Sequence, residues 1–420
     1  MRHALLSSTA LLLALATPAL AVDRSEVLGT YANIAAAKYE DSLITAQSLQ
    51  AAVKALIADP SAEALQTAKE AWLAARVPYQ QTEVYRFGNP IVDDWEGKVN
   101  AWPLDEGLID YVDAAYGGPS DENVFAALNV IANPTFTLSG KDIDATRITP
   151  TLLADTLHEA DGVEANVATG YHAIEFLLWG QDLNGHGDGA GARSWRDYAV
   201  GDACTNDNCD RRGAYLAAAT DLLVSDLEWM VAQWATGGAA RVGLAGNTDA
   251  GLAAILTGMG SLSYGEVAGE RMRLGVMLND PEEEHSCFAD NTHNDHYYDG
   301  LGVQNIYLGA YIRVDGSLVS GPSLSDLVSE ADAALDAELK GKLGATMMSL
   351  GRIKTAAEAG FAYDQMLERG NTAGEALIMG GVNGFIDQTR SIERVVNALG
   401  LDQIAFEGSD SLDDPEAVFQ

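Results

Sequence analysis

Residues 23–59 constrain the fold more than any other stretch of this chain. The segment is rich in Ala, Leu, Glu, Lys and Gln, its apolar residues recur at intervals of three and four, and it stops at Pro60. This pattern is typical of one long amphipathic helix or of two helices in succession. The start of the chain therefore predicts a helical framework.

The same periodicity returns along the chain, and no long alternating strand pattern accompanies it. Further helices are predicted from Ser61 to about Phe87, over residues 214–236 and 248–278, and repeatedly between residues 323 and 399. We therefore predict an all-α fold of two helical bundles in sequence. Residues 22–200 would form the first bundle, residues 201–213 a linker loop and residues 214–420 the second bundle.

The first 21 residues have the pattern of a secretory signal. Met1, Arg2 and His3 precede a short apolar run, and Ala19-Leu20-Ala21 offers small residues for cleavage. The apolar run is too short to span a bilayer, and no later stretch approaches the roughly 20 apolar residues that a membrane helix needs. We predict cleavage after Ala21 and an exported, periplasmic or otherwise secreted protein with no transmembrane segment in the mature chain.

Charge narrows the range of partners. The chain has 61 acidic and 25 basic residues, and its formal net charge is −36. A surface this negative repels nucleic acid and anionic lipid and favours cations in a general way. Solubility alone also accounts for such a charge, so the charge excludes nucleic acid without identifying a ligand.

Three cysteines are present. Cys204 and Cys209 are five residues apart in a polar run, and an exported protein meets an oxidising environment, so we predict that they form a disulfide in the linker. Cys287 is left over, and no Cys-based zinc pattern surrounds it. We interpret it as a structural thiol.

The densest chemical motif is the run Gly170-Tyr171-His172-Ala173-Ile174-Glu175, followed by Phe-Leu-Leu-Trp-Gly. On a helix, His172 and Glu175 lie three residues apart on one face and point to the same place. They are two candidate metal ligands, whereas zinc or a transition metal usually takes three or four. The alternative is an ordinary buried histidine bonded to a neighbouring carboxylate.

Two earlier segments offer further polar side chains. Arg76, Tyr79 and Glu83 share one face of the second predicted helix, and a carboxylate turned inward there needs a counter-charge or a cation. Asp105 follows a shaped Trp-Pro turn. It is either held there as a ligand or, with Glu106, complements a helix N-terminus.

Two loops also carry residues that could bind a cation. Residues 182–188 (Asp-Leu-Asn-Gly-His-Gly-Asp) begin like a calcium-binding loop, but His186 and Arg193 occupy positions where an EF-hand has ligands, so an EF-hand is excluded. Residues 282–296 hold a second candidate metal cluster, whose members are Glu284, His285, His293 and His296. Their spacing matches no defined motif, and an acidic loop of this kind is often simply solvated.

These motifs together resemble the imelysin family. The resemblance rests on the GxHxxE run with its Phe-Leu-Leu-Trp-Gly continuation, on Ala75-Arg76-Val77-Pro78-Tyr79 leading to Glu83, and on Trp102-Pro103-Leu104-Asp105. Residues 262–272 and 284–293 are similar to the iron-regulated protein A branch. The resemblance implies two helical bundles with the GxHxxE helix near their junction, in an exported protein of iron acquisition.

The resemblance also implies a site and a function. Related modules of periplasmic iron uptake suggest a cation site made of His172, Glu175, Glu83 and Asp105, with Arg76 orienting a carboxylate and Gly170 and Tyr79 in support. The cation would be iron or another divalent metal such as zinc, and the partner a periplasmic or outer-membrane component of iron uptake.

The family carries a peptidase label, which the residues do not favour. A zinc peptidase of the HExxH type needs two histidines and a free glutamate on one helix, and di-iron bundles use Glu-x-x-His, which is the reverse order. We expect a non-catalytic metal-binding protein. The alternatives are a metal-dependent peptidase, or an interaction protein that binds haem or a siderophore, although no CxxCH haem signature is present.

Overall fold

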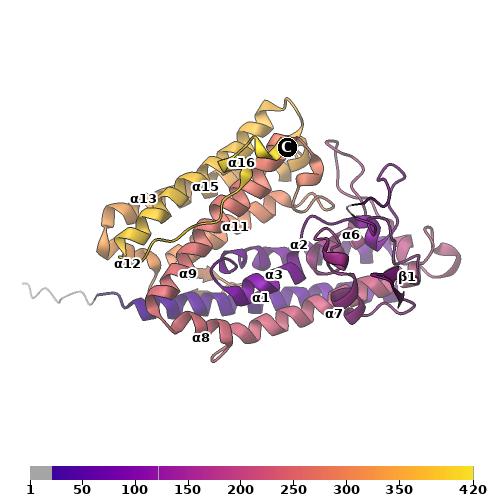
Figure 1. Cartoon of the computed structure of the whole chain (residues 1–420), viewed down its shortest axis with the longest axis horizontal. Helices are drawn as coiled ribbons and strands as arrows, with labels where there is room; N and C mark the ends of the chain where they lie inside the picture. The colour runs from indigo at the N-terminus through magenta and orange to yellow at the C-terminus, as the bar shows by residue number, and fades with distance from the viewer. Residues whose placement is uncertain (1–20, 122, 420) are drawn as a thin grey trace, which may run out of the picture.

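The computed structural model describes residues 21–121 and 123–419, and helices dominate it (Figure 1). Within these residues the strands form two small antiparallel hairpins. One pairs β1 (Thr135–Leu138) with β2 (Lys141–Asp144), and the other pairs β3 (Ala310–Ile312) with β4 (Leu318–Ser320). The all-α prediction is confirmed. The predicted signal peptide falls in residues 1–20, outside the described part, apart from Ala21 at its end.

One group of helices is built along α1 (Arg24–Ala58). The side chain of Asp23 caps this helix by accepting from Ser25 N at 2.8 Å, and Ser61 caps α2 (Ala62–Gln80) in the same way. Helices α2 and α7 (Cys209–Trp234) both pack along α1. The group is completed by α3 (Pro90–Asn100), α4 (Glu106–Ile109), α5 (Pro150–Leu152), α6 (Gly170–Trp179) and α8 (Ala239–Ala245).

The other group contains the later helices. It begins with α9 (Thr248–Ser261), which continues through the π-helical segment η6 (Leu262–Arg273) into α10 (Leu274–Leu278). The long helices α13 (Ala333–Glu358) and α15 (Thr372–Ala398) pack on each other, and α11 (Thr292–Leu308) packs on α13. The remaining helices are α12 (Leu324–Ala331), α14 (Tyr363–Leu367) and α16 (Asp410–Asp413). Figure 1 shows this group above the first, with α11 facing α2.

Helix α7 lies with the first group, although the sequence analysis assigned residues from 214 onward to the second bundle. The reason is its apolar face, which ends at Trp234. This indole packs against Tyr85, with 5.4 Å between ring centroids, and stacks on Tyr39 of α1 at 6.4 Å. The change from one group to the other therefore falls after α7 and not in the loop of residues 201–213.

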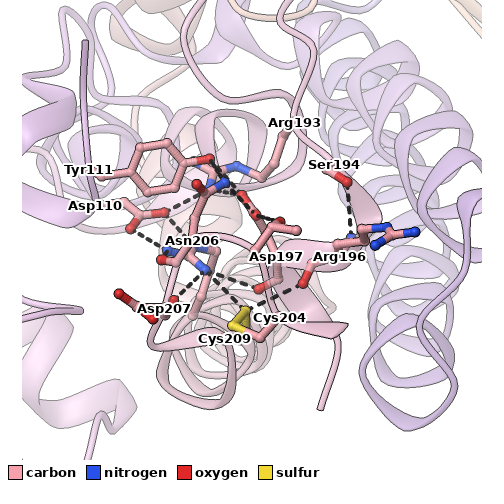
Figure 2. Close-up of a disulfide and its surroundings, with 12 residues drawn as sticks. Asp110, Tyr111, Arg193, Ser194, Arg196, Asp197, Cys204, Asn206, Asp207 and Cys209 are labelled. Carbon is pink, nitrogen blue, oxygen red and sulfur yellow. Dashed lines mark hydrogen bonds and ion pairs between the residues drawn. A yellow bond between two sulfur atoms is a disulfide. The ribbon is translucent and has the colours of Figure 1, made fainter. Parts of the chain in front are cut away.

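The predicted disulfide between Cys204 and Cys209 is present at the start of α7 (Figure 2). Cys287 remains a free, half-buried thiol. Beside the disulfide, Asp110 accepts hydrogen bonds from Arg193 at 2.7 Å and from Arg212 at 2.5 Å. The short loop is thus fastened to a buried ionic network that the sequence analysis did not foresee.

Loss of this disulfide is expected to lower the free energy of unfolding moderately. The bridge closes a loop with a sequence separation of 5 residues. Because the entropic benefit of a crosslink grows with loop length, so short a loop contributes about 2 kcal/mol. Urea unfolding of a Cys204→Ser/Cys209→Ser variant should show this loss. An unchanged midpoint would mean that the Asp110 network alone holds the loop.

The two helix groups meet at a buried polar layer. Helices α2, α3 and α6 contribute to it from the first group, and η6, α11 and the segment of residues 284–290 contribute from the second. Across residues 21–121 and 123–419, every helix is too short or too polar to span a lipid bilayer.

Candidate functional site

Helix α6 carries the central motif into the interior of the protein. All of its residues are buried, including Tyr171, His172 and Glu175. The helix starts where it does because Gly170 has a positive φ of 78° and lies against Val99 of α3. A side chain at this position would collide with the neighbouring backbone, so glycine allows α6 to approach α3 closely.

Replacing Gly170 with alanine is expected to destabilise the protein by about 2–3 kcal/mol, since a non-glycine residue is strained at positive φ. The added Cβ would lie only 2.4 Å from the carbonyl oxygen of Val99. Thermal unfolding measures the effect. As a control, Gly97→Ala on the neighbouring α3 has open space and should be neutral or stabilising. Equal effects of the two substitutions would contradict the argument.

His172 and Glu175 form the predicted pair. Nδ1 of His172 lies 2.9 Å from Oε2 of Glu175, and Oε1 of Glu175 accepts from the backbone N–H of Ala289 at 3.0 Å. Both carboxylate oxygens are therefore occupied. Nε2 of His172, by contrast, has no hydrogen-bond partner among the described residues, although the side chain is only 1% exposed. The glutamate orients the ring, and the histidine has the free coordinating atom.

A second imidazole lies beside the first. The ring of His285 is 4.7 Å from that of His172, centroid to centroid, in an edge-on arrangement. Nδ1 of His285 is 3.5 Å from Arg76 Nη2 and 3.6 Å from Asp295 Oδ2. His296, one position after Asp295 on α11, is fully buried, and neither of its ring nitrogens has a partner in the described part of the chain.

Arg76 crosses the junction between the helix groups. Its guanidinium donates to Asn100 Oδ1 of α3 at 2.6 Å and to Asp295 Oδ1 of α11 at 3.2 Å. It also lies over the ring of Tyr171, 5.0 Å from the centroid. Arg76 thus fixes Asp295 next to His285.

The imidazoles are held neutral. Burial lowers the pKa of His172 and of His285 well below the ordinary value, and nearby positive groups, Arg76 among them, add to the effect. Burial likewise lowers the pKa of His296 to about 3. A neutral imidazole is the form that coordinates a metal, so near pH 7 these rings are ready to act as ligands.

The other two predicted ligands lie elsewhere. Glu83 pairs with Arg271 of η6 at 3.2 Å, and Arg271 also holds Glu266 at 2.6 Å. Asp105 accepts hydrogen bonds from Tyr116, at 3.2 Å, and from Asn123, at the edge of a cavity of about 420 Å³. The structure brings together His172, Glu175 and Arg76, but it does not bring Glu83 or Asp105 to them.

Tyr79 supports the pair from α2 by packing its ring against Tyr171, with centroids 4.7 Å apart. Across residues 21–121 and 123–419, no three His, Cys, Asp or Glu side chains are grouped closely enough to hold one metal ion. The predicted site of four ligands is therefore not assembled as such.

The second candidate cluster separates in space. His285 joins His172, His296 packs edge-on against Tyr363 at 5.2 Å, and Nε2 of His293 lies 3.0 Å from the side-chain amide of Asn294. Glu284 is 1% exposed and forms no ion pair with any of these rings in the described part of the chain. These four residues do not form one site.

Three residues of this junction, Asp295, Arg271 and Asn100, were not among the candidates predicted from sequence. Asp295 and Asp299 are four residues apart and share one face of α11, and Arg271 binds Asp299 at 3.4 Å. This spacing was a signal that could have been noticed. Asn100 ends α3 and had no distinguishing pattern.

The protein is thus a helical protein in which a buried centre of histidines and carboxylates lies between two helix groups. The chain belongs to the imelysin family, whose sequence profile matches residues 35–392. No curated protein sequence gives a significant match.

Two solved structures share the fold. One is an iron-regulated protein A precursor from Parabacteroides distasonis, with a TM-score of 0.64 and 17% identity over 90% of this chain and 95% of that one. The other is an imelysin-like protein from Psychrobacter arcticum, with a TM-score of 0.59 and 15% identity over 92% of this chain and 100% of that one. The predicted family and fold are confirmed.

Proposed function

We propose that this protein binds iron or another divalent transition metal through Nε2 of His172, with His285 as the neighbouring imidazole ligand. The observation that carries the proposal is the unpartnered Nε2 of a histidine that is 1% exposed. A buried polar atom without a partner costs free energy, and a metal ion would remove that cost.

The surroundings of His172 support a metal more than an ordinary structural pair. Metal-binding histidines commonly donate their second ring N–H to a carboxylate, as Nδ1 of His172 can to Glu175. Imidazole ligands suit iron, zinc, copper and nickel. Arg76 neutralises Asp295 nearby, so a cation would meet no unpaired positive charge.

Iron is the first metal to test, because one structure of the same fold is named as an iron-regulated protein A, a name that refers to regulation by iron. The signal-like pattern of residues 1–21 supports an exported protein, in the periplasm or beyond it. In that setting the partner would be a component of iron uptake.

A metal-dependent peptidase is the alternative. Such an enzyme needs a water and a peptide bond within reach of the metal, and a glutamate free to act as base. Here His172 is 1% and Glu175 0% exposed, and both oxygens of Glu175 are already bonded. These contacts favour binding over hydrolysis.

Calorimetric titration of metal-stripped protein with Fe²⁺, under anaerobic conditions, and with Zn²⁺ tests the proposal. We expect saturable binding that a His172→Ala substitution removes. His158→Asn is the matched control, because His158 contacts the start of α6 at Thr169 instead of the His172 and His285 pair. Binding that survives in His172→Ala would refute this site. Chelator-sensitive peptide cleavage lost in the same variant would favour the peptidase.

Replacing Glu175 with glutamine should weaken metal binding by about 10–100-fold while leaving the ligand atom in place. The amide can still contact His172, but it lacks the negative charge that makes the imidazole a stronger donor. The dissociation constant from the same titration measures the effect. No binding at all would mean that Glu175 is itself a ligand.

A further inference from the structure

The start of α1 is attached to the second helix group by the residues that precede and open it. The backbone nitrogen of Val22 lies 2.9 and 3.1 Å from the two carboxylate oxygens of Glu330, the next-to-last residue of α12. Arg24 donates to Asp249 of α9 and to the backbone oxygen of Leu399, both at 2.6 Å. Figure 1 shows α12 at the same end of the molecule as the start of α1. This short segment therefore joins the two helix groups at that end.

Glu330 has no cationic side chain beside it in the described chain. Its hydrogen bonds there are the two with the Val22 nitrogen, and α12 has no basic residue in its last turn. A carboxylate is unfavourable at this place, because the C-terminal end of a helix is the negative end of its dipole. Asp332, which caps α13 directly afterwards, adds a second negative charge. A positive group at the position of the Val22 nitrogen would stabilise this corner of the protein.

The position of that nitrogen is fixed by its own neighbours. Val22 is half-buried, and its side chain packs against the hydrophobic core. Next along the chain, Asp23 caps α1 and Arg24 is held by the later helices. Ala21, by contrast, is exposed. The peptide bond between Ala21 and Val22 therefore lies where the chain changes from exposed to packed.

We propose that cleavage between Ala21 and Val22 supplies the positive group, and that the new α-ammonium of Val22 forms an ion pair with Glu330. Hydrolysis of this bond consumes one water molecule and leaves a carboxylate on Ala21. It converts the Val22 nitrogen from a neutral amide with one N–H into an ammonium with three. Ala19-Leu20-Ala21 has the small residues that an export signal peptidase recognises.

Processing thus completes a contact between the helix groups. Before cleavage the Val22 nitrogen carries no charge, so the charge of Glu330 stays unbalanced. After cleavage the ion pair ties the start of α1 to the end of α12, and charge-assisted hydrogen bonds are stronger than neutral ones. Neither His172 nor His285 takes part, so this inference does not depend on the proposed metal site.

The first residue of the exported protein tests the cleavage. The full chain is expressed with its own first 21 residues in a bacterial host, and the intact mass of the exported protein is measured. We expect the mass of residues 22–420. A protein that starts at any other residue, or that keeps residues 1–21, overturns the proposal.

The reactivity of the new amine tests the ion pair. Protein that begins at Val22 is treated with a succinimidyl ester at pH 7, and acylation of the α-amino group is followed by mass spectrometry of the N-terminal peptide. Only the neutral amine attacks the ester, so an ammonium held by a carboxylate reacts slowly. Glu330→Gln should raise the rate about fivefold, the size expected for an exposed ion pair at a helix end.

Glu63→Gln is the matched control. Glu63 is an exposed glutamate in the first turn of α2, which begins just beyond the other end of the 35-residue α1. This substitution should leave the rate unchanged, whereas one glycine inserted before Val22 should raise it as much as Glu330→Gln does. All of these changes fall on exposed positions, so the fold is kept. Equal rates in the unchanged protein and in Glu330→Gln overturn the proposal.

Discussion

Replacing Arg76 with methionine is expected to lower the free energy of unfolding by about 3–5 kcal/mol, the range for removing one partner of a buried ion pair. Arg76 is 1% exposed and bridges Asn100 and Asp295 across the junction of the helix groups. Methionine fills a similar volume but leaves the carboxylate of Asp295 buried without its counter-charge. Desolvation of that charge dominates the loss.

Chemical denaturation measures this effect, with Arg352→Met on an exposed face of α13 as the control. The control should change stability by less than about 0.5 kcal/mol. The double variant Arg76→Met/Asp295→Asn should recover part of the loss, because no unpaired charge remains. A loss below about 1 kcal/mol in the single variant would mean that water reaches Asp295.

Replacing Asp110 with asparagine should lower the free energy of unfolding by as much as replacing Arg76 does. Asp110 is 1% exposed and accepts a hydrogen bond from Arg193, which lies beside it in Figure 2. It also accepts two hydrogen bonds from Arg212, at 2.5 and 2.9 Å. Asparagine cannot balance two buried guanidinium groups. We expect a loss of about 3–5 kcal/mol.

The stabilisation contributed by Asp110 should decrease as the pH falls. Burial by itself would raise the pKa of Asp110, but the hydrogen bond from Arg212 and the charges of both arginines outweigh it and lower the pKa. Its stabilisation is therefore present above the unfolded pKa of about 3.9 and is lost as the pH falls through the folded value. Unfolding midpoints should therefore be measured as the pH is lowered. The midpoint of the exposed control Asp202→Asn should fall more steeply than that of Asp110→Asn, which has already lost this stabilisation. The same pH dependence in both variants would contradict the prediction.

Local patterns predicted those parts of the molecule that depend on neighbouring residues in sequence. The helix of residues 23–59, the pairing of His172 with Glu175 and the Cys204–Cys209 disulfide all follow from short spacings, and the structure contains each of them. Here the geometry of one helix turn or of one short loop determines the contact.

Contacts across the junction of the two helix groups could not be predicted from sequence spacing in the same way. His285 lies beside His172 although more than 100 residues separate them in sequence, and only packing of the two helix groups brings them together. Glu83 was a reasonable ligand until its partner was known. Its contact with Arg271, which also pairs with Glu266 and Asp299, joins residues that are nearly 190 positions apart in sequence.

Helix α7 shows a further limit of prediction from the sequence. Its amphipathic pattern correctly predicted a helix, but an apolar face does not say which partner it will cover. Its packing against Tyr39 and Tyr85 through Trp234 decided that it lies with α1.

X-ray absorption at the iron or zinc edge of the loaded protein tests whether His172 and His285 bind the metal, because it identifies the atoms bound to the metal. We predict a nitrogen-containing shell with the outer scattering of imidazole, contributed by His172 and His285, and its reduction in His172→Ala. A shell of oxygen atoms alone, unchanged in that variant, would contradict the account.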